Sequence, residues 1–292
     1  MESPITLDEG QFQTSLSTTF SNVFEYDVWG NTQTDIDLGL WRTTFGYTYG
    51  LTDLIDMRID VPIVSNPGGF LDGALQAYHD AFGFPNSGRE LVSNNRFAYR
   101  VVHNGTTLAN YSSTIAGLGD VTLRLKKLFL DKKNRLPFKL SLAPYLKFPT
   151  GSRDHGLGSG HFDAGLSIFA QKSWERWTMT SQLGGVLIDN RTDLEPILKH
   201  GFIALGQSVE FQIADWISTI AQLSGNTPLF KQTDNADLSK MALDLNIGAA
   251  GTINLWRGPF KEFFYQFSLG EDILCAGPSV DFSVLFLGGV RF

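Results

Sequence analysis

The chain has 292 residues, of which 18% are charged and 13% aromatic, and its formal net charge is −7 at pH 7. Its lack of any run of about 18 apolar residues excludes a membrane-spanning helix on length alone, and its acidic balance without a Lys/Arg-rich stripe argues against a nucleic-acid partner. The single cysteine, Cys275, excludes an internal disulfide framework, and no Cys/His cluster has zinc-site spacing, so no metal or other cofactor is expected.

The first ten residues, MESPITLDEG, have neither the basic segment nor the apolar segment of a secretory signal peptide. The rest of the chain has the pattern of a cell-envelope protein. We therefore expect a signal peptide that this sequence does not include, and a location in the bacterial outer membrane.

Apolar and polar residues alternate with a period of two along most of the chain, as on a β-strand with one apolar face. In one such segment, Ile55, Ile59 and Ile63 alternate with Asp56 and Asp60. Most segments exceed the usual five or six residues of globular strands and match the roughly 9–11 residues that a tilted strand needs to cross a bilayer. The predicted strands are residues 10–22, 35–49, 54–64, 119–130, 136–149, 161–172, 177–188, 201–213, 216–225, 240–254, 260–270 and 280–292.

The connections between these strands alternate between short turns and long polar loops, which is typical of an outer-membrane barrel. Four of the six tryptophans, Trp174, Trp177, Trp216 and Trp256, lie at or beside short turns, and amphipathic rings prefer the headgroup level of a membrane. The sequence therefore predicts an all-β fold: a transmembrane antiparallel β-barrel of 12 strands that forms a single domain over residues 1–292. The expected surroundings are outer-membrane lipid and lipopolysaccharide.

The longest connection, residues 65–118, is predicted to be an extracellular loop that folds over the barrel mouth. It contains a predicted short helix at about residues 70–83 and a hairpin at about 95–112. The hairpin turns at Asn104-Gly105, a signal for a type I′ turn. Its short arms place it above the membrane. If it inserted instead, the barrel would have 14 strands, and this alternative stays open.

The predicted helix carries Leu71, Leu75, Tyr78 and Phe82 on one face. An apolar face on a solvent-side loop must be buried, so it could plug the barrel mouth, or pack on other loops and the outer leaflet. The alternative is a structural lid that binds no ligand. The candidate ligand or gate residues are Phe70, Leu71, Leu75, Tyr78, His79, Phe82 and Phe84.

The inward face of the predicted strands carries charges of both signs. Buried charges must be paired or hydrated, so this face is either a polar conduit or ligand track, or a salt-bridged lumen that fills the barrel. The mixture of signs argues against a strongly ion-selective pore. The candidate lumen charges are Asp56, Arg58, Asp60, Arg124, Lys126, Lys139, Lys147, Asp163, Glu210 and Asp244.

An enzyme is not predicted. All five histidines lie in or beside the long loops, where solvated polar residues are expected. Ser159 and His161 lie at a loop–strand junction, and His79 and Asp80 lie on the predicted helix. Neither pair belongs to a spaced set of nucleophile, base and orienting group. No catalytic residue is assigned.

The last predicted strand alternates up to the final residue, Phe292. A closed barrel leaves no free strand edge, so this strand must pair with the first one. A terminal aromatic residue on such a strand also resembles the insertion signal of outer-membrane proteins. That resemblance implies the barrel-assembly machinery as a partner.

Several motifs resemble an uncharacterised family of bacterial outer-membrane proteins, the domain of unknown function 3187. The most specific is the block that begins with GGFLD at 68–72, and further matches are GLGD at 117–120, KFPTG at 147–151 and GSGHFD at 158–163. The shorter GLGD and PTG pattern is similar, more distantly, to the phenol meta-pathway family. That similarity implies a 12-stranded channel that passes small hydrophobic molecules, and it carries no catalytic residues.

We therefore expect an outer-membrane channel or uptake protein for small molecules, hydrophobic ones included, that the 65–118 loop gates or covers. The alternative is a non-transport barrel, structural or partner-binding, with a closed lumen. A channel requires a continuous lumen or a lateral opening, whereas the alternative requires a lumen closed by its own charge pairs.

Overall fold

The computed structural model describes residues 2–83, 88–130, 138–189, 191–255, 259–274 and 280–292. Its helical elements are α1 (Asp72–Phe82) and two short 3₁₀ turns at Arg89–Leu91 and Asp237–Ser239. Within these ranges, no helix has the length and apolar content that crossing a bilayer requires. The strands are β1 (Phe12–Asp27), β2 (Thr32–Thr52), β3 (Ile55–Asn66), β4 (Ala98–His103), β5 (Thr106–Asn110), β6 (Thr114–Leu118), β7 (Val121–Leu130), β8 (Lys139–Phe148), β9 (Asp163–Trp174), β10 (Trp177–Ile188), β11 (Gly201–Ala214), β12 (Ile217–Asn226), β13 (Ala242–Asn254), β14 (Glu262–Asp272) and β15 (Phe282–Arg291).

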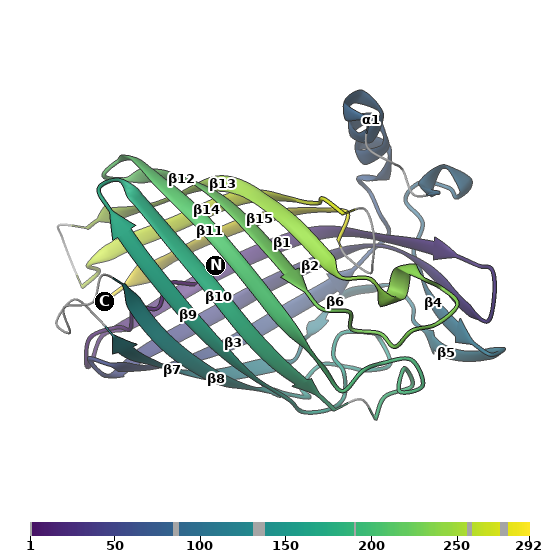
Figure 1. Ribbon diagram of the computed structural model, residues 1–292, viewed down its shortest axis with the longest axis horizontal. Coiled ribbons are helices and arrows are strands. Elements are labelled where there is room, and N and C mark those ends of the chain that lie inside the picture. Colours follow the sequence, from purple (N-terminus) through teal and green to yellow (C-terminus); the bar gives the residue numbers. More distant parts are fainter. Residues whose placement is uncertain (1, 84–87, 131–137, 190, 256–258, 275–279) are drawn as a thin grey trace.

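The strands form a closed antiparallel barrel, shown with its axis nearly horizontal in Figure 1. β1 pairs with both β2 and β15, and the Phe292 N–H donates to the Phe12 carbonyl at 2.9 Å. The last strand therefore closes the barrel against the first, as predicted. β6 and β7 follow one another along β3 and make one wall strand, so the wall has 12 strands, which confirms the predicted fold.

The break between β6 and β7 lies beside a proline. Pro62 has no amide hydrogen to donate to a neighbouring strand, and its carbonyl accepts a hydrogen bond from the Gly119 N–H at 2.8 Å. A side chain at Gly119 would meet Val64 and Pro62 at 2.9–3.0 Å, so this close approach requires glycine. The wall therefore bends here without opening.

The two faces of the wall differ as the alternation predicts. On β2, Phe45 is 56% exposed and Tyr47 is also exposed, whereas Thr48 on the other face is buried. Buried polar residues such as Ser141 and Ser167 face the lumen from β8 and β9. The outer face of the wall is therefore apolar. The lumen face carries small polar and charged side chains together with some apolar ones, such as Phe264 and Leu287.

At the long-loop end, β1 and β2 continue beyond the wall. There β2 pairs with β4 in place of β3, and β4 pairs with β5. The β4–β5 turn places Asn104 and Gly105 at φ 50° and 76°, the left-handed conformation that a type I′ turn requires. The hairpin adds two strands to this extension and none to the barrel, so the 14-stranded alternative is wrong.

The extension carries a small apolar core that bridges the barrel mouth. Val101 and Ala109 of the hairpin pack with Ile197 from the β10–β11 connection, and Leu194 and Phe230 lie at the margin. β1 and β10 are six strands apart in either direction around the barrel, so this contact joins opposite sides of the mouth. We call β4, β5, the outer ends of β1 and β2, and the loop segments that pack on them the cap.

α1 buries a different face from the predicted one. Its buried residues are Asp72, Leu75 and His79. Tyr78 is exposed and Phe82 is 69% exposed, and their rings pack on each other with centroids 5.0 Å apart. Tyr78 and Phe82 are therefore not buried against the protein, as plugging of the barrel mouth by this face would require. Packing of these two side chains on the outer leaflet stays a prediction.

Candidate functional site

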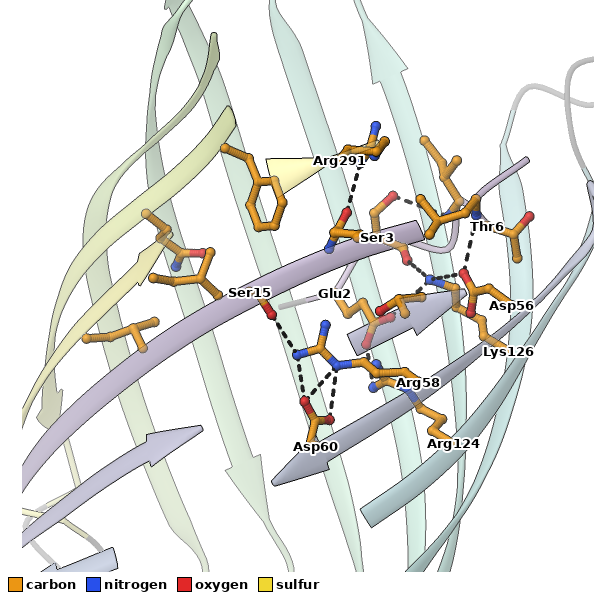
Figure 2. Close-up of a pocket in the computed structure, with 18 of the residues that line it drawn as sticks. Glu2, Ser3, Thr6, Ser15, Asp56, Arg58, Asp60, Arg124, Lys126 and Arg291 are labelled. Atoms are coloured by element: carbon orange, nitrogen blue, oxygen red, sulfur yellow. Dashed lines mark hydrogen bonds and ion pairs between the residues drawn. The ribbon is translucent and has the colours of Figure 1, made fainter. Parts of the chain in front are cut away.

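The lumen at the short-turn end contains a cavity of about 770 Å³ (Figure 2). Its lining comes from the N-terminal segment and from β1, β2, β3, β7 and β12–β15. Besides charged residues, the lining includes the amides Gln13, Gln222, Asn246 and Gln266. Apolar side chains, among them Ile220, Phe264 and Leu285, line the rest of the cavity. Its charged and amide groups require hydrogen-bond partners, which water supplies in a cavity of this size.

A network of charges from β3 and β7 forms one wall of the cavity (Figure 2). The strand register places Asp56 opposite Lys126 and Arg58 opposite Arg124. Lys126 Nζ lies 3.3 Å from Asp56 Oδ2, and Arg58 Nη2 lies 2.7 Å from Asp60 Oδ1. The two arginines face each other across the strands, so a further acidic group is required to compensate for their repulsion.

The N-terminal segment supplies this acidic group from inside the lumen. Glu2 pairs with Arg124 and with Lys126, the latter at 3.0 Å, and Ser3 Oγ donates to Gln171 Oε1 on β9 at 3.2 Å. Burial alone would raise the pKa of Glu2, but Arg124 and Lys126 together lower it below its usual value. Glu2 is therefore ionised and holds the segment against β7.

Sequence reasoning missed the N-terminal segment. Between residues 2 and 9 its large apolar side chains are Ile5 and Leu7, which are too few to establish a period-two pattern. The only signal was one acidic residue, Glu2, in a chain whose inward face carries basic residues. That signal does not specify a location, because the contact of Glu2 with Arg124 spans more than a hundred residues of chain.

A second charge cluster holds two loop motifs together. Lys147 Nζ pairs with Asp163 and, at 3.2 Å, with Asp120. Asp120 also accepts hydrogen bonds from the N–H groups of Gly151 and Ser159, both at 2.9 Å. The GLGD, KFPTG and GSGHFD motifs therefore meet at one buried carboxylate, which explains their residue types structurally.

The other predicted lumen charges lie apart from both clusters. Glu210 lines a separate polar recess with Arg176, next to the β9–β10 turn. Asp244 lies opposite Asp272 in the β13–β14 register, and Lys139 is half-buried at the start of β8. The ten predicted charges therefore form no single track along the lumen.

The candidate gate residues lie outside the lining of the lumen cavity. Phe70 packs on the outer face of the wall, with its ring centroid 4.9 Å from Phe20 and 6.2 Å from Trp41. Trp41 shares this face with the exposed Phe45. Phe84 lies outside the described residues. The lining of the lumen cavity also lacks Leu71, Leu75, Tyr78, His79 and Phe82.

A buried ionic cluster attaches α1 to the barrel. Arg89 donates to Asp72 Oδ1 at 2.9 Å, to Asn22 Oδ1 at 2.7 Å and to Asp281 Oδ2 at 2.6 Å. Its guanidinium also lies 4.4 Å from the centroid of the Phe24 ring. Sequence reasoning assigned no site role to Asp72 or Arg89.

Residues 1–291 match the family described as protein of unknown function (DUF3187). The chain belongs to this family. The resemblance carried by the GGFLD block and the loop motifs is thus confirmed over nearly the whole length. No curated protein sequence matches the chain.

Among the described residues, no group of three or more His, Cys, Asp or Glu side chains could hold a metal ion.

Solved structures show a similar fold. The COG4313 outer-membrane channel from Pseudomonas putida F1 aligns with a TM-score of 0.63 at 15% identity, over 100% of this chain and 99% of that one. The Pseudomonas putida toluene transporter TodX gives 0.39 at 10% identity, over 98% and 89% of the two chains. A Pseudomonas aeruginosa FadL homologue gives 0.41 at 8%, over 98% and 90%. Only the first score exceeds 0.5, and it shows that the chain has the fold of an outer-membrane barrel.

Proposed function

We propose that this protein is a channel or uptake protein of the bacterial outer membrane for small molecules, hydrophobic ones included. The observation that supports this most is the lumen cavity of about 770 Å³ with its polar and charged lining. It lies inside a wall whose outer face is apolar. A wall of this kind separates lipid from an aqueous interior, as a passive channel requires.

The short-turn end would face the periplasm and the cap would face outward. Exposed Trp174, Trp177 and Trp216 gather at the short turns, in agreement with an aromatic belt at a membrane interface. Contacts with lipopolysaccharide, and recognition of Phe292 by the barrel-assembly machinery, stay predictions. The Phe292 ring stacks on Phe12 with centroids 4.1 Å apart, so its aromatic character also serves closure of the barrel.

The 65–118 loop would gate the channel through its hairpin. The β4–β5 hairpin contributes Val101 and Ala109 to the core that bridges the mouth. The helical part, by contrast, begins with Phe70 on the outer face of the wall. Movement of the hairpin would therefore change access to the lumen more directly than movement of α1.

Conductance in planar bilayers tests the proposal. We would compare the intact protein with a variant lacking residues 66–90 and a variant in which residues 98–110 are replaced by a short Gly/Ser linker. The proposal predicts ion conductance that rises when the hairpin is removed and changes less when residues 66–90 are removed. If all three proteins are silent, the channel proposal is contradicted.

One observation favours the alternative, a non-transport barrel with a closed lumen. Lys126 and Asp56 are almost fully buried at the cavity wall, and the N-terminal segment lies against them. Paired charges of this kind could fill the lumen permanently. In that case the purified protein would bind partners at its surface and exclude small solutes from liposomes even after removal of the hairpin.

A further inference from the structure

The cap contains a second cavity, of about 160 Å³ and partly open to solvent, far smaller than the one in the lumen. Most of its lining is apolar and comes from the outer ends of β1 and β2, from β4 and from the loops that meet them. Ile36, Tyr99, Ile197 and Phe230 are among these residues. Protein interiors are close-packed and seldom leave a space larger than a water molecule, so an apolar space of this size in a small core requires an explanation.

One end of this cavity is polar. Glu25 and Thr34 line it, and buried Asn235 lies behind them. Asn235 Nδ2 donates to Thr34 Oγ1 at 3.2 Å, and Thr34 Oγ1 lies 3.4 Å from Glu25 Oε1. The contact between Asn235 and the same Glu25 oxygen is also long, at 3.5 Å.

The Glu25 carboxylate therefore retains capacity to accept hydrogen bonds. Both of its contacts are at the outer limit for a hydrogen bond, and both reach Oε1. A carboxylate has about four acceptor positions. Among the described residues no partner reaches Oε2. A ligand in the cavity could donate a hydrogen bond to the Glu25 carboxylate at the polar end, while its apolar part would contact the apolar lining.

We propose that this cavity binds a single-ring aromatic molecule with one hydrogen-bond donor, of the phenol type. A dry apolar cavity of about 150 Å³ is known to bind benzene, so the volume suits one ring. The unused acceptor capacity of the Glu25 carboxylate suits one hydroxyl. This inference rests on the proposed uptake function, because it names a class of molecule that would enter at the mouth that the cap bridges.

Ligand-observed ¹⁹F NMR on the purified, detergent-solubilised protein tests the inference with two probes of equal ring size, 4-fluorophenol and 4-fluorotoluene. We expect saturable binding of 4-fluorophenol. Glu25→Gln should weaken it about tenfold, because a charge-assisted hydrogen bond becomes a neutral one. The affinity for 4-fluorotoluene should change less than about twofold, since that probe has no donor.

Two cavity-filling variants and one matched control locate the site. Val23→Phe and Ile36→Phe add a ring from neighbouring strands that line the cavity, and each should abolish saturable binding. Val209→Phe makes the same change as the first variant on the exposed outer face of β11, far from the cap, and should bind as the unaltered protein does. Because two variants fill the cavity from different strands, misfolding of one of them still leaves the other to test the site.

The inference is overturned if neither probe binds saturably to the intact protein, or if both filling variants bind like the Val209→Phe control. Equal binding of the two probes, unchanged by Glu25→Gln, would overturn the donor requirement. These outcomes are distinct from failure of the proposed function. A conducting protein that binds no probe contradicts only the ligand site, whereas a silent protein that binds the probe contradicts only the channel.

Discussion

Arg89 shows how a single side chain can fix the position of a loop. Its planar guanidinium presents several donors in a fixed geometry, and here they reach α1, β1 and the residue before β15 through Asp72, Asn22 and Asp281. The side chain is only 3% exposed. Lysine, with one charged nitrogen, could not satisfy the three acceptors in the same arrangement.

Replacing Arg89 with alanine should release α1 from the barrel. The carboxylate of Asp72, 1% exposed, would lose its cationic partner, and an unpaired buried charge costs about 3–5 kcal/mol. Hydrogen exchange of the α1 amides should therefore become more than about 100-fold faster. Hydrogen–deuterium exchange with mass spectrometry measures this directly.

Arg191→Ala provides the matched control for that experiment. Arg191 also pairs with an aspartate, Asp189, but its side chain is 79% exposed. Exposed ion pairs contribute little to stability, so exchange of the α1 amides should not change. Equal exchange rates in the two variants would contradict the assigned role of Arg89.

Asp281 should make the attachment of α1 depend on pH. Burial raises its pKa to about 7, with Asp272 and Glu271 adding to the rise and Arg89 opposing it. A carboxyl group whose pKa is higher in the docked state binds more protons there between about pH 4 and pH 7. Docking should therefore weaken as the pH rises through this range.

Limited proteolysis of the 66–96 segment at pH 5, 6, 7 and 8 measures this dependence. Cleavage should accelerate toward pH 8 in the unaltered protein. Asp281→Asn, which cannot ionise, should reduce the slope of the profile. The contact between His79 of α1 and Glu271, at 3.4 Å, is present in both proteins and can account for the remaining slope. A profile that falls with pH, or one with the same slope in the variant, would show that another group controls docking.

At the scale of elements, the strands could be predicted because their signal is local. The alternation that defines a lipid-facing and a lumen-facing side is set by neighbouring residues, and it predicted most wall strands to within a few residues. β6, which extends the wall strand of β7, was placed in the predicted loop 65–118. β1 and β2 run longer than predicted, to Asp27 and from Thr32. Their outer ends belong to the cap, where contacts with distant loops, rather than a membrane, determine the pattern.

The buried side of α1 could not be predicted for the same reason. Its apolar spacing favoured Tyr78 and Phe82, but the orientation depends on Asp72 and on an arginine 17 residues away. That pairing is decided by tertiary contacts and leaves no periodic signal. The lumen location of Glu2 and the split of the predicted charges into separate clusters are further consequences of such long-range pairing.

The N-terminal segment should restrict the lumen as an element of its own. Deleting residues 2–9 should raise the conductance in planar bilayers, because the segment lines the cavity. Glu2→Gln alone should shift selectivity toward anions, since Arg124 and Lys126 lose their acidic partner. Reversal potentials in a salt gradient measure this shift. Glu9→Gln, on an exposed part of the segment, is the control and should leave selectivity unchanged.

At the scale of the whole molecule, each end of the barrel carries an element that is additional to the wall. The cap bridges the mouth at the long-loop end, and the N-terminal segment occupies the lumen at the short-turn end (Figure 1). The cap continues the wall strands β1 and β2 and is joined to them by the backbone pairing of β2 with β4. The N-terminal segment is held in the lumen by side-chain contacts of Glu2 and Ser3, so it could move while the hydrogen-bonded wall stays intact. Composition and alternation predicted the closed wall, and the turn signal at Asn104-Gly105 predicted the hairpin of the cap. Nothing in the sequence predicted that the N-terminal segment lies in the lumen.

Cysteine labelling in proteoliposomes tests most directly whether the outer face meets lipid while the lumen holds water. In a Cys275→Ser background, we would introduce Gln222→Cys, which lines the cavity, and Leu223→Cys, its neighbour on the exposed outer face of β12. A charged, membrane-impermeant thiol reagent should label position 222 at least about tenfold faster than position 223, because hydrocarbon excludes water from the outer face. Equal labelling of the two positions, or faster labelling at 223, would contradict an aqueous lumen inside a lipid-facing wall.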